Sequence, residues 1–340
     1  MAMLVRHSAA SMSLFFFALL ALVILGYGAL SITDGGPNLA LNLGVEILGT
    51  LITVAVIGPI VRSTQEGNVR SHPTLNIRRF VDRSAMARRQ VQVLATFSNL
   101  LNNRETERFL GIARQHLDRG IAVEFLLLHP DSLSSEQRQR ELRGTGTDVS
   151  VLIHHNVRVL NGLLDSVAPD KRRNLSVRLY DASASVILYR WDDRGLTSFL
   201  PTDGLAEEGE HLEVDMRSPL GGFVSARFAA LWHSPTTITL QSFLRMPVVI
   251  IEDGRRAKPI EALYVTVEQG HYLVSSEILA ALARRPGGTL RARRADDDAV
   301  TFDLFVVDDR ETDLQNRLVE SYHEKYDMSA HTFVGMRPSV

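Results

Sequence analysis

The sequence contains no cysteine, which excludes disulfide bonds, thiolate nucleophiles and cysteine-ligated metals. Neither sign of charge is in excess, because 37 Lys and Arg residues are balanced by 39 Asp and Glu residues, for a formal net charge of −2. From this balance we expect no broad basic surface and therefore no nucleic-acid partner. The lack of cysteine also fits a chain exposed to the reducing cytoplasm.

A second absence marks the N-terminal region, where no charged side chain occurs between His7 and Asp34. A bilayer core needs roughly 20 apolar residues in a helix, and this run exceeds that length. A second apolar run follows after a short turn and contains a single carboxylate, Glu46. We therefore predict a transmembrane helical hairpin over residues 8–61.

Arginine is concentrated immediately after the hairpin, in residues 62–88, which we interpret as a basic juxtamembrane linker. Basic residues close to the end of a membrane helix stay in the cytoplasm, so both termini are expected there. A carboxylate inside the membrane is costly and indicates a functional or inter-helix contact. For Glu46 we favour packing within a homo-oligomer, a dimer, over an ion path.

The residues from 89 onward have the pattern of an α/β domain. A strand-like stretch at 91–95 is followed by apolar residues at helical spacing, and then by the continuous apolar run 122–128. Such a run suits a strand that is buried on both faces, and strand, helix and strand at this spacing form a βαβ unit. Further strands are expected at 175–180, 185–191 and 212–216, and helices after Asp148 and Gly221.

A second unit is expected over residues 246–340. Strands are predicted at 248–251, 262–267, 272–274 and 300–307, and helices at 276–285 and 314–326. The predicted fold class is thus a membrane-anchored chain with two N-terminal transmembrane helices, a cytoplasmic α/β domain over 89–235 and a small α+β C-terminal domain.

Four segments of the α/β region carry a resemblance to a known family: Arg119–Ser132, Leu175–Asp181, Leu188–Arg194 and Phe228–Trp232. Over residues 89–235 the chain resembles the phospholipase D superfamily, chiefly its membrane-tethered bacterial members. The resemblance implies a phospholipase D-like α/β fold and a place in the bacterial inner membrane, as a multi-pass protein.

The same resemblance shows where the chain departs from the family. The superfamily motif is H-x-K-x(4)-D, in which the histidine attacks phosphorus and the lysine holds a phosphate oxygen. When its aspartate is placed on Asp192, the histidine position is Ser185 and the lysine position is Ile187. A serine without a general base is a poor nucleophile, and isoleucine offers phosphate no charge and no donor. We therefore predict a catalytically degenerate domain and no enzyme activity.

If the pocket of the family is kept, it is expected to bind a ligand. Two further residues, His129 and Asp131, end a predicted parallel strand, where α/β domains commonly bind ligands, although an ordinary polar turn explains them as well. The candidate ligand pocket comprises His129, Asp131, Ser185, Ile187, Tyr189 and Asp192.

No metal site and no cofactor are predicted. His154 and His155 are adjacent in a predicted helix, so they do not share one face, and no third ligand is apparent. Residues 246–340 have a short resemblance to small split-barrel proteins related to flavin-binding folds. Because no phosphate-binding cluster accompanies it, no flavin is expected.

The function that fits these observations is a membrane-anchored, cytoplasm-facing sensor or scaffold with a degenerate phospholipase D-like ligand-binding domain. One alternative is a two-helix membrane effector of bacterial antiphage defence, gated by a nucleotide signal. A second alternative is a phosphodiester or lipid hydrolase with a non-standard site. The expected partners are the lipid bilayer, a second copy of the chain and a small-molecule or nucleotide ligand.

Overall fold

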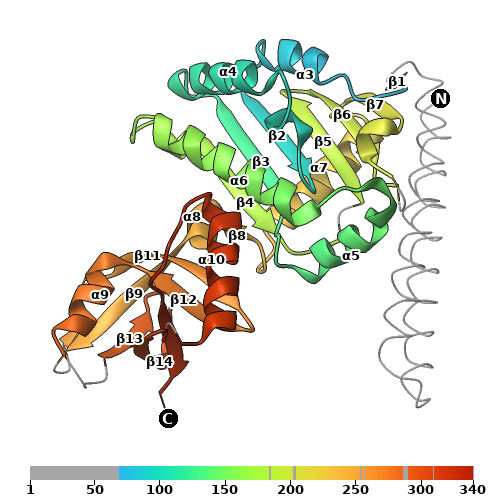
Figure 1. The fold of residues 1–340 in the computed structure, drawn as a ribbon. Coiled ribbons are helices and arrows are strands. Elements are labelled where there is room, and N and C mark those ends of the chain that lie inside the picture. The colour runs from blue at the N-terminus through green and yellow to red at the C-terminus, as the bar shows by residue number, and fades with distance from the viewer. Residues whose placement is uncertain are drawn as a thin grey trace, which may run out of the picture. The chain divides into compact units, whose positions relative to one another are not determined.

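The computed structural model describes residues 69–183, 185–201, 204–252, 255–256, 258–285, 290–308 and 310–339. The predicted hairpin with Glu46 and the first part of the predicted linker lie outside these ranges. In the part of the chain that is described, no helix is both long and apolar enough to cross a bilayer. The chain from Arg70 onward forms one compact unit. It contains an α/β lobe (residues 69–239) and a barrel lobe (residues 245–339), joined by α8 (Leu240–Leu244) (Figure 1).

An eight-stranded sheet forms the centre of the α/β lobe, in the order β1-β7-β6-β5-β2-β3-β4-β8. Its strands are β1 (Val69–His72), β2 (Gln90–Ala95), β3 (Ala122–Leu128), β4 (Leu175–Tyr180), β5 (Val186–Trp191), β6 (Arg194–Phe199), β7 (His211–Asp215) and β8 (Ile238–Thr239). Strands β2, β3 and β4 are parallel, and β5, β6 and β7 extend the sheet antiparallel from β2. The parallel centre requires helical crossovers, whereas a tight hairpin suffices between β5 and β6.

Helices cover both faces of this sheet; in Figure 1, α6 lies in front of it and α7 behind it. The helices of the lobe are α3 (Ile77–Ser84), α4 (Thr106–Asp118), α5 (Leu133–Glu141), α6 (Val149–Ser166) and α7 (Pro219–Trp232). Because both faces are covered, β3 is apolar and almost continuously buried rather than alternating. The helix α6 begins where the Asp148 side chain accepts a hydrogen bond from the Val151 N–H.

The barrel lobe is a closed antiparallel barrel of six strands. The order is β9-β11-β12-β15-β14-β13, and β13 pairs back onto β9. The strands are β9 (Arg245–Glu252), β11 (Ile260–Val267), β12 (Gly270–Val274), β13 (Leu290–Arg294), β14 (Asp297–Val306) and β15 (Val334–Pro338), with the short β10 (Arg255–Arg256) beside β9. Closure leaves these six strands without a free edge.

Apolar side chains fill the barrel, and two helices complete its core. Helix α9 (Ser276–Ala283) contributes Ile278 and Ala281 to the same cluster as Val248, Leu273 and Leu290. Helix α10 (Thr312–Tyr326) packs Leu318 and Tyr322 in a second cluster with β11 residues and with Phe333, just before β15. The small α+β unit expected over 246–340 is therefore a barrel with two helices, and its interior is side-chain core.

Most elements lie where the sequence predicts them, and the βαβ unit is present as β2, α4 and β3, with β2 and β3 parallel. The α/β lobe, however, begins before residue 89. Strand β1 and helix α3 lie in the stretch interpreted as a linker, and Phe80 and Val81 of α3 are buried. This short helix has only two buried apolar residues among several arginines, so its periodicity is hard to see in the sequence.

Candidate functional site

The end of β5 where the phospholipase D motif would place its reacting residues carries Ser185 and Ile187. Both lie on the same side of the strand, since alternate residues share a face. Ile187 is only 4% exposed, and its carbonyl oxygen accepts a hydrogen bond from the Thr197 hydroxyl at 2.8 Å. The Ser185 hydroxyl is buried and has no hydrogen-bond partner among the described residues. The structure therefore offers this serine no base that would activate it.

The hollow next to Ile187 is too small for a phosphodiester. It measures about 20 Å³ and is lined by residues including Thr96, Phe97, Arg138, Ile187, Leu200 and Leu205. That volume corresponds to about one water molecule.

Among the described residues that line the hollow, Arg138 is the cation, and it is already engaged. Its guanidinium donates to the carbonyl oxygens of Pro201 and Gly204, at 2.7 and 2.8 Å, and to Glu141 at 2.8 Å. The arginine therefore fixes the backbone at Pro201 and Gly204, after β6.

At the opposite end of β5 lies Asp192, to which the resemblance assigns the motif's aspartate, and its contacts are structural. Asp192 has a φ of 48° in the turn to β6. Its carboxylate accepts the backbone N–H groups of Arg88, Arg89 and Gln90 at 2.9, 2.8 and 3.2 Å. Partial burial works to raise the pKa of Asp192, but these three hydrogen bonds together outweigh it, and the pKa is lowered. The carboxylate thus ties the β5–β6 turn to the start of β2.

Tyr189, the remaining candidate on β5, lies in the core. Its ring contacts that of Phe80 edge-on with a centroid distance of 5.2 Å, and its hydroxyl is 3.0 Å from the Ser98 hydroxyl. Complete burial raises its pKa well above the usual value, so the phenol stays neutral. The residue belongs to the packing between the sheet and α3.

His129 and Asp131 lie together at the end of β3, away from β5. The His129 Nδ1 atom accepts the Asp131 backbone N–H at 3.1 Å, which makes a local turn. The His129 ring contacts Phe243 of α8 edge-on at 5.2 Å. Burial lowers the pKa of His129, and the nearby Asp131 carboxylate opposes that shift. These two residues therefore face the segment that joins the two lobes.

The junction between the lobes holds a group of polar contacts made by α6 and α10. The Glu324 carboxylate accepts from the Ser150 hydroxyl at 2.8 Å and lies 3.1 Å from His154 Nδ1. The hydrogen bond to His154 is the main reason that the pKa of Glu324 is lowered. Arg158 of α6 donates to the Glu324 carbonyl oxygen. The C-terminal helix is thus fastened to a helix of the α/β lobe.

Lys325 is the buried cation of this junction and is only 6% exposed. Its ammonium lies 3.8 Å from the ring centre of Tyr264 and 4.3 Å from that of Phe243, and donates to the Tyr264 carbonyl oxygen at 3.0 Å. Burial lowers the pKa of Lys325 to about 7, although Asp131 works in the opposite direction. The cluster of His129, Asp131, His154, Phe243, Glu324 and Lys325 is called the junction cluster below.

The six residues of the predicted pocket are thus distributed over separate places. Ile187 adjoins the small hollow and Ser185 lies just before β5, Asp192 follows the far end of the same strand, Tyr189 is in the core, and His129 and Asp131 reach the junction cluster. His154 and His155 have different partners, because His155 bonds to the Leu101 carbonyl oxygen instead. No group of three potential metal-binding side chains occurs within the described ranges.

The sequence interpretation missed Lys325. A usable signal exists: Leu318, Tyr322 and Lys325 follow one another at helical spacing, so the lysine occupies the buried face of α10. The chain has only three lysines, at 171, 258 and 325, and this one stands in an apolar series. A charged residue at such a position indicates a specific partner.

No protein-family model matches the chain, and no curated protein matches it in sequence. Solved structures are similar at low identity. Phosphatidylserine synthase of Haemophilus influenzae Rd KW20 is 13% identical over 50% of this chain and 39% of its own length, with a TM-score of 0.33. The roles of individual residues rest on the geometry given above.

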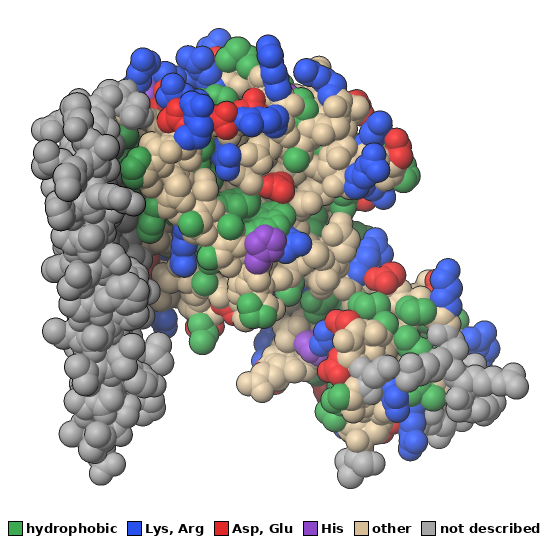
Figure 2. Space-filling view, turned by 180° about the vertical axis from the view of Figure 1, so that it is seen from behind, with side chains coloured by type: hydrophobic (Ala, Val, Ile, Leu, Met, Phe, Trp, Pro, Cys, Tyr) green, Lys and Arg blue, Asp and Glu red, His purple; other side chains and the backbone are tan. Residues whose placement is uncertain are grey.

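The archaeal chromatin protein TrmBL2, whose structure shows a novel mode of DNA binding, is 11% identical over 58% of this chain and 69% of its own length, with a TM-score of 0.29. The prediction that excluded a nucleic-acid partner is wrong as an exclusion, because a structural neighbour binds DNA. Net charge averages over the whole surface. Basic side chains, nearly all arginines, gather over the end of the α/β lobe that holds α3 and α4, with acidic side chains among them (Figure 2).

Proposed function

We propose that this protein is a sensor or scaffold, anchored in the bacterial inner membrane and facing the cytoplasm, whose phospholipase D-like domain has lost catalysis. The observation that carries the proposal is the reaction end of β5. Buried Ile187 stands where the family has its phosphate-holding lysine, next to a hollow of about 20 Å³. Among the described residues, the Ser185 hydroxyl has no hydrogen-bond partner that could act as a base. The domain keeps the motif's aspartate as a structural brace and lacks the groups that perform the reaction.

The junction cluster supports a role in binding and transmission rather than turnover. It joins the carboxyl end of β3 to the C-terminal helix through hydrogen bonds and aromatic contacts. A change at the end of β3 that moves Phe243 would alter the packing of Lys325, which contacts both that ring and Tyr264 of the barrel lobe. The two lobes are therefore mechanically linked, as a sensor requires.

The loss of catalysis is tested by looking for a covalent intermediate. In the family the nucleophile is phosphorylated during turnover, so an active serine here would carry a phosphoryl adduct. The purified full-length chain is mixed with bis(p-nitrophenyl) phosphate, quenched in acid and weighed by mass spectrometry. We expect the unmodified mass. An adduct that maps to Ser185 would overturn the proposal in favour of a hydrolase.

The location is tested with reporters fused at either end of the chain. The arginine-rich stretch that follows the predicted hairpin is expected to hold both termini in the cytoplasm. Green fluorescent protein should therefore fluoresce at both ends, and the fusions should sediment with the membrane fraction. Active alkaline phosphatase fused after the C-terminus would contradict this topology.

A further inference from the structure

The outer edge of β4 is only partly covered. Strand β3 pairs with β4 from Leu175 through Tyr180. On the other side β8 pairs only with Arg178 and Leu179. In the described part of the chain, no strand lies beside Leu175–Val177 on the side opposite β3. The backbone N–H and C=O groups that point outward there are available to another strand.

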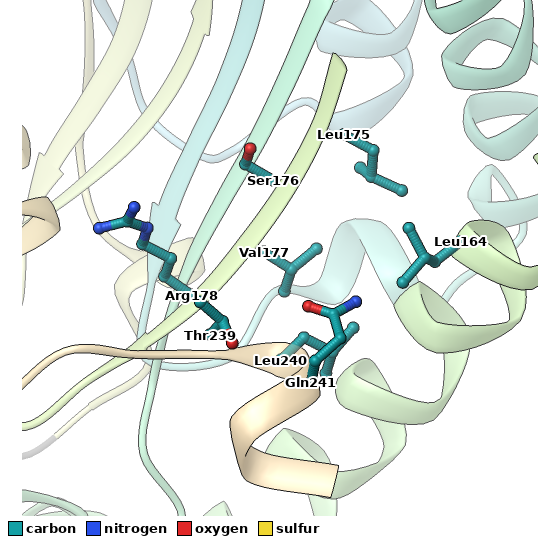
Figure 3. A pocket seen from close by; sticks show the side chains of 8 residues that line it. All are labelled: Leu164, Leu175, Ser176, Val177, Arg178, Thr239, Leu240 and Gln241. Atoms are coloured by element: carbon teal, nitrogen blue, oxygen red, sulfur yellow. The ribbon is translucent and has the colours of Figure 1, made fainter. Parts of the chain in front are cut away.

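A hollow of about 130 Å³ lies at this uncovered edge (Figure 3). Four consecutive residues of β4 line it, from Leu175 to Arg178, together with Leu164 of α6 and Gln241 of α8. Successive side chains of a strand point to opposite faces, so four in a row can line one hollow only if the hollow faces the strand's edge. In Figure 3 the Arg178 guanidinium indeed points away from Val177.

The hollow exists because β8 stops early. Its register is antiparallel, with Arg178 opposite Thr239. A longer β8 would place residues 240 and 241 beside Val177 and Ser176. Instead the Thr239 side chain accepts the Ser242 N–H and starts α8, which turns the chain away from the sheet. The space is therefore that of a missing stretch of strand.

The surroundings favour an acidic partner. The turn before β4 carries Lys171, Arg172 and Arg173, of which Arg173 is exposed. On the strand itself, Arg178 is held in place, because its Nη1 donates to the Trp232 carbonyl oxygen at 2.8 Å and its guanidinium stacks on the Trp232 ring. Leu164 and Val177 provide an apolar floor for alternate side chains of an incoming strand.

We propose that the β4 edge over Leu175–Val177 binds an extended segment of another protein, which adds to the sheet antiparallel to β4, in line with β8, and carries acidic residues beside the strand. Main-chain hydrogen bonds would supply the affinity. The apolar floor and the arginines would supply the preference for a strand with apolar and acidic side chains. The proposal does not depend on whether the domain has lost catalysis.

The test is hydrogen exchange on the full-length chain with an acetylated probe peptide, Glu-Thr-Val-Thr-Val-Glu. About 4 kcal/mol of binding free energy corresponds to a dissociation constant of about 1 mM. At about twice that concentration, exchange over Leu175–Val177 should slow about threefold, as 1 + [L]/Kd requires. A peptide with proline in place of both valines should have no effect, because it keeps the charges but lacks two N–H donors.

Two matched variants locate the effect. Gln241→Trp fills the hollow from the exposed start of α8 and should abolish the slowing. Gln137→Trp places the same side chain at an exposed position of α5, distant in sequence from the hollow, and should leave the slowing of exchange intact. No slowing in the wild-type chain at about 10 mM peptide, ten times the expected constant, overturns the proposal. Equal slowing with the proline peptide, or in Gln241→Trp, overturns it as well.

Discussion

The two ends of β5 differ in the contacts that their side chains make. At one end Asp192 retains the position of the family motif and receives three backbone hydrogen bonds. At the other end, Ser185 and Ile187 occupy the positions that the resemblance assigns to the groups reacting with phosphate, and a hollow of about 20 Å³ adjoins Ile187. The comparison shows two structural roles along one strand: Asp192 holds the start of β2 by hydrogen bonds, whereas Ile187 is packed in the core. Under the proposed function, the first role would explain why an aspartate persists at a position whose chemistry is lost.

The largest effect is expected at the retained end. Asp192→Ala removes the acceptor of three N–H groups and should lower the free energy of unfolding by about 4 kcal/mol, since hydrogen bonds to a charged group contribute more than neutral ones. Asp192→Asn should lose less, because it keeps one acceptor oxygen and tolerates a positive φ. Urea unfolding measures both. Asp193→Ala, at the neighbouring residue, is the control and should have a small effect. An equal loss of stability in this variant would contradict the bracing role of Asp192.

A pH dependence of stability is expected from Lys325. The unfolded lysine has a pKa of about 10.4, and burial lowers the folded value to about 7. Between these values the unfolded chain binds more protons, so stability rises as the pH increases from 7 toward 9, by about 2 kcal/mol.

Lys325→Met keeps a long apolar side chain in the aromatic cluster and cannot titrate. The variant should therefore lose the rise in stability over the same pH range, measured by urea unfolding at each pH. If the variant and the wild-type chain show the same slope, the pH dependence arises elsewhere and Lys325 does not titrate in this window.

A smaller effect is expected for the contact between α6 and α10. Glu324→Ala leaves His154 and Ser150 without their acceptor and should cost about 1 kcal/mol. Hydrogen exchange should become faster in α10. Glu324→Gln retains an acceptor oxygen and should restore most of the protection. Glu320→Ala, on the exposed side of the same helix, is the matched control, and faster exchange there by the same factor would show a general effect on the helix.

The smallest effect is expected at the reaction end of β5. Ser185→Ala removes a buried hydroxyl that has no hydrogen-bond partner, so stability should change by no more than about 0.5 kcal/mol or increase slightly. Thermal unfolding is sufficient to measure it. A loss of about 2 kcal/mol would show that the hydroxyl has a partner that matters to the fold.

Elements that depend on local sequence pattern can be predicted, whereas those that depend on long-range packing cannot. Continuous apolar runs such as β3, and clean caps such as Asp148, place elements correctly from sequence. Strand β6 was not predicted, because Arg194–Phe199 has no regular alternation of apolar and polar residues, and its burial comes from its neighbours. The closed barrel depends on the pairing of β9 with β13, which are about 40 residues apart.

The candidate site stays a prediction. The motif alignment placed Ser185 and Ile187 on one face of a strand; Ile187 lies within β5, and Ser185 comes just before it. It could not show that Asp192 is a brace or that Tyr189 lies in the core, since both depend on partners around Gln90 and Phe80. The junction cluster could not be predicted from the sequence, because it depends on which helix of the α/β lobe the C-terminal helix contacts.

Turnover by the purified full-length chain tests the central claim most directly. The substrates are bis(p-nitrophenyl) phosphate, phosphatidylcholine vesicles and double-stranded DNA, each compared with a blank and with Ser185→Ala. The account predicts no hydrolysis above the blank for the wild-type chain or the variant. Hydrolysis by the wild-type chain that Ser185→Ala abolishes would contradict it.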